Sequence, residues 1–180
     1  YAREIHKESQ ALTNMVTEFL NFARPVTASI YSVDLIELLE AVIADLKNVR
    51  PGKYQIQFNP AMEAIVPCDA TLMRQSFLNL LINASEAMND GGVATIKTSY
   101  NPIDKSILIS ISDTGTGIKK ELTKQLFNPF FTTKPMGTGL GLAITKRLTE
   151  LHNGLLTFGC MCISFDIIRN HAHYMITHKS

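Results

Sequence analysis

Two glycine clusters separated by a single loop constrain this chain more than any other feature. The first, at residues 113–118, reads Asp-Thr-Gly-Thr-Gly-Ile, and the second, at residues 137–144, reads Gly-Thr-Gly-Leu-Gly-Leu-Ala-Ile. Glycine has no Cβ and adopts positive φ at little cost, so a ligand can approach until backbone N–H groups bond its phosphate oxygens. One such cluster alone is typical of a tight turn. Two clusters, together with the polar helix described below, indicate a nucleotide pocket.

The second cluster runs directly into a predicted helix. Apolar side chains recur at helical spacing after Gly141, so the positive N-terminal end of this helix would face the glycine loop. An anion is the ligand that such a helix end favours. We therefore expect Gly137, Gly139 and Gly141 to lie against phosphate oxygens.

A polar stripe marks the helix predicted over residues 71–88. Apolar residues nearly encircle this segment, which predicts a buried helix, yet Gln75, Asn79 and Asn83 recur at every fourth position. Glu86 lies close to the same line. Burying an amide without a partner costs roughly 1–3 kcal/mol, so the stripe is expected to face a polar site. Amide oxygens suit Mg²⁺, which also takes phosphate oxygens and water; a solvated face or a buried amide network is the alternative.

In order and spacing, these segments resemble the ATP-binding catalytic domain of the sensor histidine kinases, which DNA gyrase, the heat-shock chaperone ATPases and the mismatch-repair ATPases share. The resemblance covers most of the chain, from Tyr1 to about Gly154. Its four motifs are an N box at residues 79–84, a first glycine box at 113–117, an F box at 127–131 and a second glycine box at 137–141. The implied fold is an α+β, two-layer α/β sandwich of the Bergerat type, with helices packed on one face of a mixed, largely antiparallel sheet.

The resemblance implies roles in binding ATP and Mg²⁺ for individual residues. Asn83 would coordinate the Mg²⁺ that bridges the phosphates, Asn79 would support it as a second catalytic residue, and Asp113 would accept a hydrogen bond from the adenine amine. Gly115 and Gly117 would let their loop close beside the base and sugar. The other expected nucleotide-binding residues follow the stripe, the F box and the two glycine boxes. They are Glu86, Ile118, Phe131, Thr132, Thr133, Lys134, Gly137, Thr138, Gly139, Leu140 and Gly141.

A mobile lid is implied between the F box and the second glycine box. Thr132, Thr133, Lys134 and Thr138 would belong to it, and the Pro, Gly and Thr content of residues 128–139 fits a flexible loop. Lys134 is the cation of this loop that would offset phosphate charge. A lysine that is merely solvated is the alternative.

Asn79 separates two functions within the superfamily. The resemblance implies that hydrolysing members carry a glutamate general base at this position, one helical turn before the metal asparagine. Asparagine cannot take up a proton near neutral pH, so transfer of the γ-phosphate to a histidine is favoured over hydrolysis. Glu86 lies on the other side of Asn83 and is a poor substitute by position. The phosphate would then pass to a response regulator.

Residues 1–24 are expected to form the second helix of the family's dimerisation and phosphotransfer hairpin. Ile5, Leu12 and Phe19 recur every seven residues, which predicts an apolar seam, and an Arg-Pro pair ends the segment. The seam could pair with the missing first helix or with a second copy of this chain, or it could remain frayed. The first helix, which carries the phosphoacceptor histidine in the family, is expected to be absent from this chain. His6 lacks the acidic residue and the proline that follow the family's acceptor, so we interpret it as an exposed helix residue.

The remaining elements are predicted from apolar periodicity and turn signals. Strands are expected at residues 30–33, 54–58, 64–66, 94–100, 106–111, 155–158 and 163–168, and a helix capped by Asp34 is expected to reach residue 48. The catalytic domain would occupy residues 25–168. Residues 169–180 have no counterpart in the family and are expected to be an irregular tail, in spite of the histidines His171, His173 and His178.

Composition agrees with an intracellular module. The chain has 180 residues, is 46% hydrophobic and carries a net charge of +1, which does not favour nucleic acid. No apolar run approaches the roughly 20 residues that cross a bilayer. A cytoplasmic location is expected for this chain. Whether the parent protein is a membrane-anchored sensor is left open. Cys68, Cys160 and Cys162 are interpreted as reduced thiols.

Two alternatives to a histidine kinase stay open. The chain could be a degenerate kinase that uses its pocket and N-terminal helix only to bind a nucleotide or a partner. It could also be a superfamily ATPase, which the asparagine at residue 79 disfavours.

Overall fold

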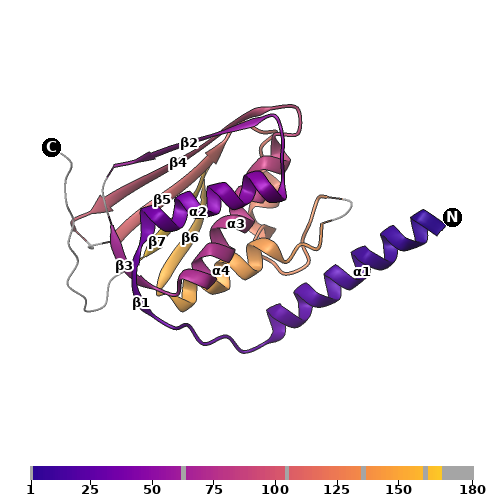
Figure 1. The fold of residues 1–180 in the computed structure, drawn as a ribbon, viewed down its shortest axis with the longest axis horizontal. Helices are drawn as coiled ribbons and strands as arrows, with labels where there is room; N and C mark the ends of the chain where they lie inside the picture. The colour runs from indigo at the N-terminus through magenta and orange to yellow at the C-terminus, as the bar shows by residue number, and fades with distance from the viewer. Residues whose placement is uncertain (1, 62–63, 104–105, 135–136, 160–161, 168–180) are drawn as a thin grey trace.

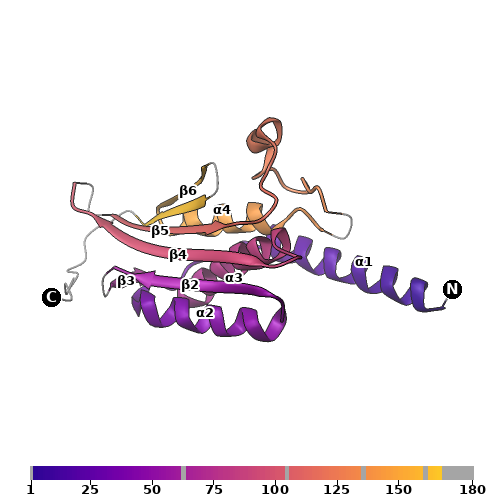
Figure 2. The same ribbon diagram turned by 90° about the horizontal axis from the view of Figure 1, so that it is seen from above.

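The computed structural model describes residues 2–61, 64–103, 106–134, 137–159 and 162–167. One long helix, α1 (Ala2–Ala23), projects from a body in which three helices pack on a five-stranded sheet (Figure 1). Those three helices are α2 (Leu35–Val49), α3 (Ala70–Ala87) and α4 (Gly141–Leu151). Figure 2 shows α1 leading away from the body and α2 lying beside the first strand of the sheet. The predicted α+β sandwich is confirmed.

The sheet has the order β2-β4-β5-β7-β6. Its strands are β2 (Tyr54–Pro60), β4 (Gly92–Asn101), β5 (Ser106–Asp113), β6 (Gly154–Gly159) and β7 (Cys162–Ile167). Only the pairing of β2 with β4 is parallel among these four pairings, so the sheet is mixed and largely antiparallel, as predicted. The two remaining strands, β1 (Tyr31–Asp34) and β3 (Ile65–Cys68), form a separate antiparallel pair, and a short 3₁₀ helix, η1 (Lys120–Gln125), follows β5.

The sequence predicted most elements to within a few residues. Asp34 caps α2 as expected, because its carboxylate accepts the N–H groups of Ile36 and Glu37. The strands at the pocket run further than predicted, and β5 ends on Asp113 itself. The boundary at residue 168 and the tail at 169–180, with its three histidines, lie outside the described residues.

The main core lies between the sheet and helices α2 and α3. Helix α2 turns its predicted apolar face inward, and α3 contributes Phe77, which is fully buried. The buried side chains from the two helices and the sheet include Leu35, Leu38, Leu39, Val42, Leu46, Met73, Leu80, Leu81, Ile96 and Ile109. Cys68 belongs to this core as a free thiol, and burial, with the Asp69 charge beside it, raises its pKa to about 12. A thiol in this state is inert, as expected for a packing residue.

Asp69 joins three parts of the chain at the start of α3. Its carboxylate accepts the N–H groups of Thr71 and Leu72 in the helix and, across the chain, the N–H of Ser29 at 2.9 Å. Its own N–H donates to Nε2 of buried His152 at 3.0 Å. Burial alone would raise the pKa of Asp69, but the three N–H groups, and then His152, stabilise the charged form and lower the pKa below its usual value.

We expect the chain to lose stability as the pH decreases, and Asp69 to account for part of this loss. Because its pKa is lower in the folded state, the carboxylate stabilises the fold above its unfolded pKa of about 3.9, and this contribution is lost as the pH falls through and below that value. Asp69→Asn should therefore lower the free energy of unfolding at pH 7 by roughly 1–2 kcal/mol and flatten its decline below pH 5. Urea unfolding at pH 3.5–7 measures both effects.

Asp34→Asn is the matched control for that experiment. Asp34 also caps a helix, but its carboxylate accepts only N–H groups of that helix. A smaller loss of stability is expected, because asparagine is a comparable cap. Equal losses in the two variants would show that the bond to Ser29 contributes nothing.

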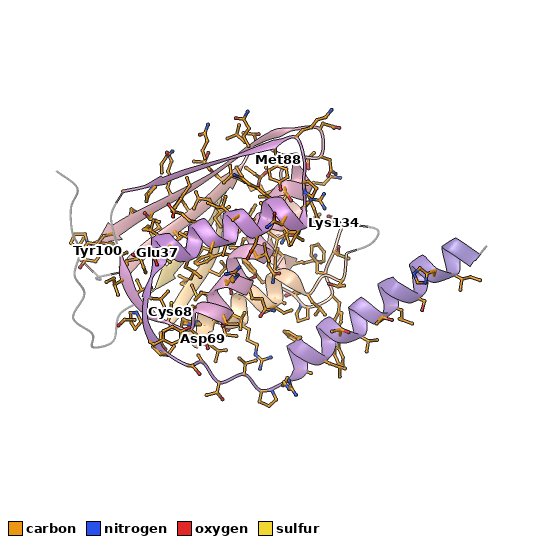
Figure 3. All side chains as sticks on the ribbon, viewed as in Figure 1. Glu37, Cys68, Asp69, Met88, Tyr100 and Lys134 are labelled. Carbon is orange, nitrogen blue, oxygen red and sulfur yellow. The ribbon has the colours of Figure 1, made fainter. Side chains whose placement is uncertain are left out.

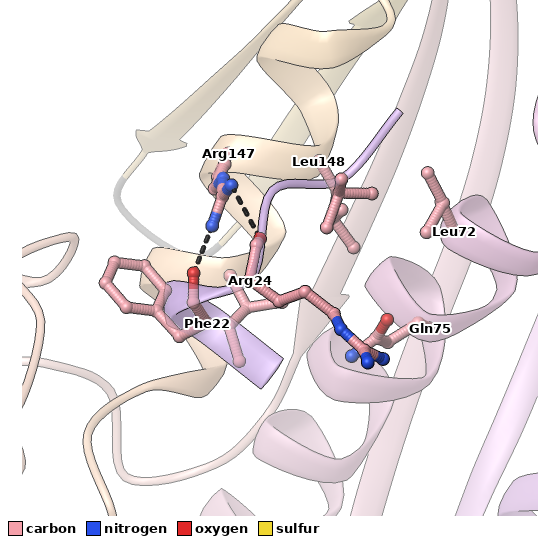
Figure 4. Close-up of a pocket in the computed structure, with 8 residues that line it drawn as sticks. Phe22, Arg24, Leu72, Gln75, Arg147 and Leu148 are labelled. Atoms are coloured by element: carbon pink, nitrogen blue, oxygen red, sulfur yellow. Dashed lines mark hydrogen bonds between the residues drawn. The ribbon is translucent and has the colours of Figure 1, made fainter. Parts of the chain in front are cut away.

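Helix α1 is tied to the body at its C-terminal end. Arg147 of α4 donates to the carbonyl oxygens of Phe22 and Arg24, the latter at 3.0 Å, and its guanidinium lies over the Phe22 ring (Figure 4). A cavity of about 260 Å³ lies beside this contact; Val26 and Leu148 are among its lining residues. The end of α1 is thereby held against α4.

The seam predicted on α1 faces solvent over much of its length. Ile5 is 65% exposed and Leu12 is 63% exposed, whereas the ring of Phe19 lies 6.1 Å from that of Phe130 in the body. His6 is exposed, in agreement with its interpretation as a helix surface residue. Packing of the seam against a partner helix stays a prediction. No helix within the described ranges has both the length and the apolar character of a membrane span.

Candidate nucleotide site

The first glycine cluster lies against the end of α3. A Cβ placed on Gly115 would lie 2.5 Å from the Cβ of Ala87 and 2.6 Å from its carbonyl oxygen. That oxygen also accepts the N–H of Thr116 at 3.2 Å. Gly117 has a φ of +67°, a conformation that favours glycine. Gly115 is therefore required by the close approach of two backbones, and Gly117 by a turn.

The second glycine cluster lies against the F box. Gly139 has a φ of +69°, and a Cβ placed on it would lie 2.5 Å from the carbonyl carbon of Phe130. The two residues are also joined by a hydrogen bond from Phe130 N–H to Gly139 O at 3.1 Å. Phe130 itself has a φ of +67°, which is a strained conformation for a bulky residue. Strain of this kind clusters at ligand sites and persists only where the surroundings enforce it.

The N-terminus of α4 opens onto this loop. Leu140 occupies the N-cap position, and its side chain offers no oxygen to the first turn of the helix. The amide of Asn79 reaches from α3 to the carbonyl of Gly141 at 3.4 Å, which ties the polar stripe to this end of α4. N–H groups in an uncapped first turn suit an anionic ligand.

Asp113 stands at the end of β5 with one oxygen in use. Its Oδ1 accepts the N–H of Gly115 at 2.9 Å, which fixes the side chain at the start of the glycine loop. Within the described part of the chain, Oδ2 accepts no hydrogen bond. The half-buried carboxylate thus keeps one acceptor for an external donor, as the predicted contact with an adenine amine requires.

The polar stripe ends in a cluster of charged groups. Lys134 Nζ donates to Asn83 Oδ1 at 2.8 Å and forms an ion pair with Glu86 Oε2. Arg50 Nη1 lies 3.3 Å from Glu86 Oε1. Lys134 thus lies at the polar stripe (Figure 3), although the sequence also left open a solvated loop position for it. Arg50 was missed, because it falls between the helix predicted to reach residue 48 and the strand predicted at 54–58, and no motif includes it.

The remaining predicted residues lie in the two loops, and among them Thr132 bonds the backbone of Lys134. Thr132 Oγ1 accepts the N–H of Lys134 at 3.0 Å, and Thr138 Oγ1 accepts that of Leu140 at 3.3 Å, so both hydroxyls brace the loop. Phe131 is half-buried, as is Gly137, whereas Ile118 and Thr133 are exposed. Contacts between these residues and a nucleotide stay predictions.

The donor set fits a cation beside an anion. Asn83 Oδ1 already accepts an ammonium, so its oxygen faces a position where positive charge is stable. Glu86 supplies a carboxylate next to it. An amide oxygen and a carboxylate are the ligand types that Mg²⁺ prefers.

Comparison with known proteins identifies the relatives of this chain. The family model described as histidine kinase-, DNA gyrase B- and HSP90-like ATPase matches residues 68–171. The signal transduction histidine-protein kinase AtoS of Escherichia coli (strain K12) is 34% identical over 157 residues, which cover 86% of this chain and 26% of AtoS. The chain likewise spans only 21% of the length of sporulation kinase E of Bacillus subtilis (strain 168) and 34% of that of the sensor histidine kinase ZraS of Escherichia coli O157:H7.

Solved structures agree with these relatives. The catalytic domain of the histidine kinase ThkA superposes with a TM-score of 0.69 at 28% identity, covering 78% of this chain and 95% of that domain. A structure of ThkA in complex with the response regulator protein TrrA gives a TM-score of 0.76 at 25% identity, covering 94% of this chain and 51% of ThkA. The second match extends over 94% of the chain, so it includes at least part of α1.

Proposed function

Since this chain belongs to the family of histidine kinase-, DNA gyrase B- and HSP90-like ATPases, with sensor histidine kinases as its relatives, we propose that it binds Mg·ATP and transfers the γ-phosphate to a histidine. The observation that carries the proposal is the meeting of both glycine clusters with α3, the helix that bears the polar stripe. The first cluster contacts Ala87, and the second is joined to Asn79 through Gly141.

Each part of the site has a distinct task in this proposal. The free oxygen of Asp113 would accept the adenine amine, and the uncapped N–H groups at the start of α4 would bond phosphate oxygens. Lys134 would offset phosphate charge from its place beside the stripe. Catalysis would come from positioning and charge neutralisation, as phosphoryl transfer generally requires.

Mg²⁺ would be held by Asn83, and when bound it would neutralise charge on the phosphates. Asn79, which we also predict to be catalytic, uses its amide to hold the carbonyl of Gly141. Glu86 is paired with Lys134 and Arg50. Neither Asn79 nor Glu86 is therefore available as a general base that would activate water. This arrangement supports transfer over hydrolysis.

The phosphoacceptor and the downstream partner are proposed from the family. The acceptor would be a histidine on a dimerisation helix that packs on the exposed seam of α1, where Ile5 and Leu12 lie open. The response regulator partner is supported by the ThkA–TrrA complex, whose fold matches this chain. A cytoplasmic site of action is proposed on the same ground.

The experiment that tests the pocket is calorimetric titration of a non-hydrolysable ATP analogue, with and without Mg²⁺, on the wild type and on Asp113→Asn. We expect the wild type to bind the analogue in a metal-dependent manner. Asp113→Asn should weaken this binding roughly tenfold or more, because asparagine offers an uncharged oxygen and can present an amide donor to the base. Asp45→Asn is the control, because Asp45 pairs only with Arg74 at the surface among the described residues. It should bind as the wild type does.

Two outcomes would overturn the proposal. No binding by the folded wild type would favour a degenerate kinase that acts as a partner-binding module. Vigorous hydrolysis of ATP by the wild type, without any acceptor domain, would favour a superfamily ATPase.

A further inference from the structure

The ammonium of Lys134 lies on the oxygen that the proposed function assigns to a metal ion. Lys134 Nζ donates to Asn83 Oδ1 at 2.8 Å. A divalent ion bound to the same oxygen would meet this positive charge at short range, and the two cations would repel each other. The amide oxygen therefore cannot serve both, so metal binding at Asn83 requires that the ammonium leave.

Glu86 keeps the ammonium beside Asn83. It forms an ion pair with Lys134 through Oε2, while its other oxygen, Oε1, lies 3.3 Å from Arg50 Nη1. The Glu86 side chain is 28% exposed and that of Lys134 is 42% exposed, so the pair is partly open to solvent and its attraction is partly screened by salt. Both carboxylate oxygens are thus engaged, and the orientation of the carboxylate is set from two sides.

Arg50 is itself fixed in place. Its N–H donates to Leu46 O at 2.8 Å as α2 ends, and its carbonyl accepts the hydroxyl of Tyr54 on β2. Its second guanidinium nitrogen donates to Asn89 Oδ1 at 3.1 Å. A guanidinium anchored at its backbone and at both terminal nitrogens gives Glu86 a defined partner.

We propose that Lys134 is a placeholder cation: it occupies Asn83 while no divalent ion is bound, and Glu86 and Arg50 are positioning residues that keep it there. The inference rests on the proposed function only in taking Asn83 as a metal ligand. If Lys134 occupies Asn83 in this way, the affinity of the protein for a divalent ion without nucleotide is lower than its oxygen donors alone would give.

Mn²⁺ alone, without nucleotide, is the direct probe. The fraction of free Mn²⁺ is measured by electron paramagnetic resonance on the full chain. Lys134→Met should raise the association constant for Mn²⁺ several-fold, because it removes the competing charge and leaves Asn83 and Glu86 in place. Lys120→Met is the matched control, since Lys120 is exposed in η1 and pairs with no carboxylate in the described chain; it should leave binding unchanged.

The double variant Lys134→Met/Asn83→Ala tests whether the increase in Mn²⁺ affinity depends on Asn83. Loss of the gain in the double variant would support the placeholder, whereas a gain that persists without Asn83 would overturn it. Equal Mn²⁺ binding by Lys134→Met and the wild type would also overturn it.

Lysine labelling reports on the positioning residues separately. Reductive methylation followed by mass spectrometry should modify Lys134 several-fold more slowly than Lys120 in the wild type, and Arg50→Met should reduce this protection. Arg74→Met is the control, because Arg74 pairs with Asp45 and not with Glu86. Equal reactivity of the two lysines in the wild type would overturn the inference.

Failure of this inference can be distinguished from failure of the proposed function. Metal-dependent binding of the ATP analogue without any gain of Mn²⁺ affinity in Lys134→Met would reject the placeholder alone. A gain of Mn²⁺ affinity in a protein that binds no nucleotide would reject the proposed function alone.

Discussion

Replacing Asn83 with alanine is expected to weaken binding of a Mg·ATP analogue roughly 10- to 100-fold and to abolish phosphate transfer to an added acceptor domain. A polar contact to a charged group contributes about 1.5–3 kcal/mol, which corresponds to this range of affinity. Transfer suffers more than binding, because the metal neutralises charge that develops as the phosphoryl group moves. Calorimetry and a radiolabelled transfer assay measure the two effects.

Gln75→Ala provides the control within the same helix. Gln75 lies on the polar stripe two turns before Asn83, but it is exposed and lines the cavity beside α1 (Figure 4). Its loss should leave both the affinity for the analogue and the transfer rate near those of the wild type. Transfer at the wild-type rate by Asn83→Ala would show that the metal assignment is wrong.

The second large effect is expected at Gly139. A non-glycine residue at a φ of +69° costs about 1–2 kcal/mol, and the added Cβ would also lie 2.5 Å from backbone of Phe130, which cannot yield as a flexible side chain can. We expect Gly139→Ala to lower the free energy of unfolding by roughly 2–4 kcal/mol and to displace the loop from the F box. Urea unfolding and titration of the ATP analogue give the two readouts.

Gly141→Ala is the matched control two residues later. Apart from its chain neighbours and the backbone of α4 itself, no atom of the described residues lies within 4 Å of a Cβ placed there, and the residue begins α4. Its stability should stay within about 0.5 kcal/mol of the wild type, or rise slightly, because alanine favours the helix. Equal destabilisation by both substitutions would show that the cluster is sensitive to any Cβ and that the contact with Phe130 is not the cause.

The local elements of this fold were predictable because their signals are local. The spacing of Leu35, Leu38 and Leu39 fixes the buried face of α2, and an aspartate just before them satisfies the first N–H groups of the helix. Alternating apolar residues likewise predicted β4 and β5 and their antiparallel pairing. The parallel pairing of β2 with β4 was not predicted, because it joins segments across the whole of α3 and no local pattern specifies it.

Residue spacing singled out part of the candidate site for the same reason. The polar stripe and the glycine clusters are periodic or contiguous, so Asn79, Asn83 and Asp113 stand out from residue spacing alone. Arg50 does not, because nothing in its segment distinguishes a turn arginine from one that reaches Glu86. Its charge, opposite to that of the stripe's single carboxylate, is the only signal that residue types offer.

The sequence by itself therefore determined the ligand class, through glycine clusters and amide oxygens whose chemistry does not depend on their neighbours. Only the tertiary structure decided which glycine tolerates a Cβ, that Lys134 lies on Asn83, and that Arg50 orients Glu86. The physical reason is distance along the chain. Steric contacts and ion pairs depend on separations of a few ångströms between segments that folding brings together, and residue spacing does not encode those separations.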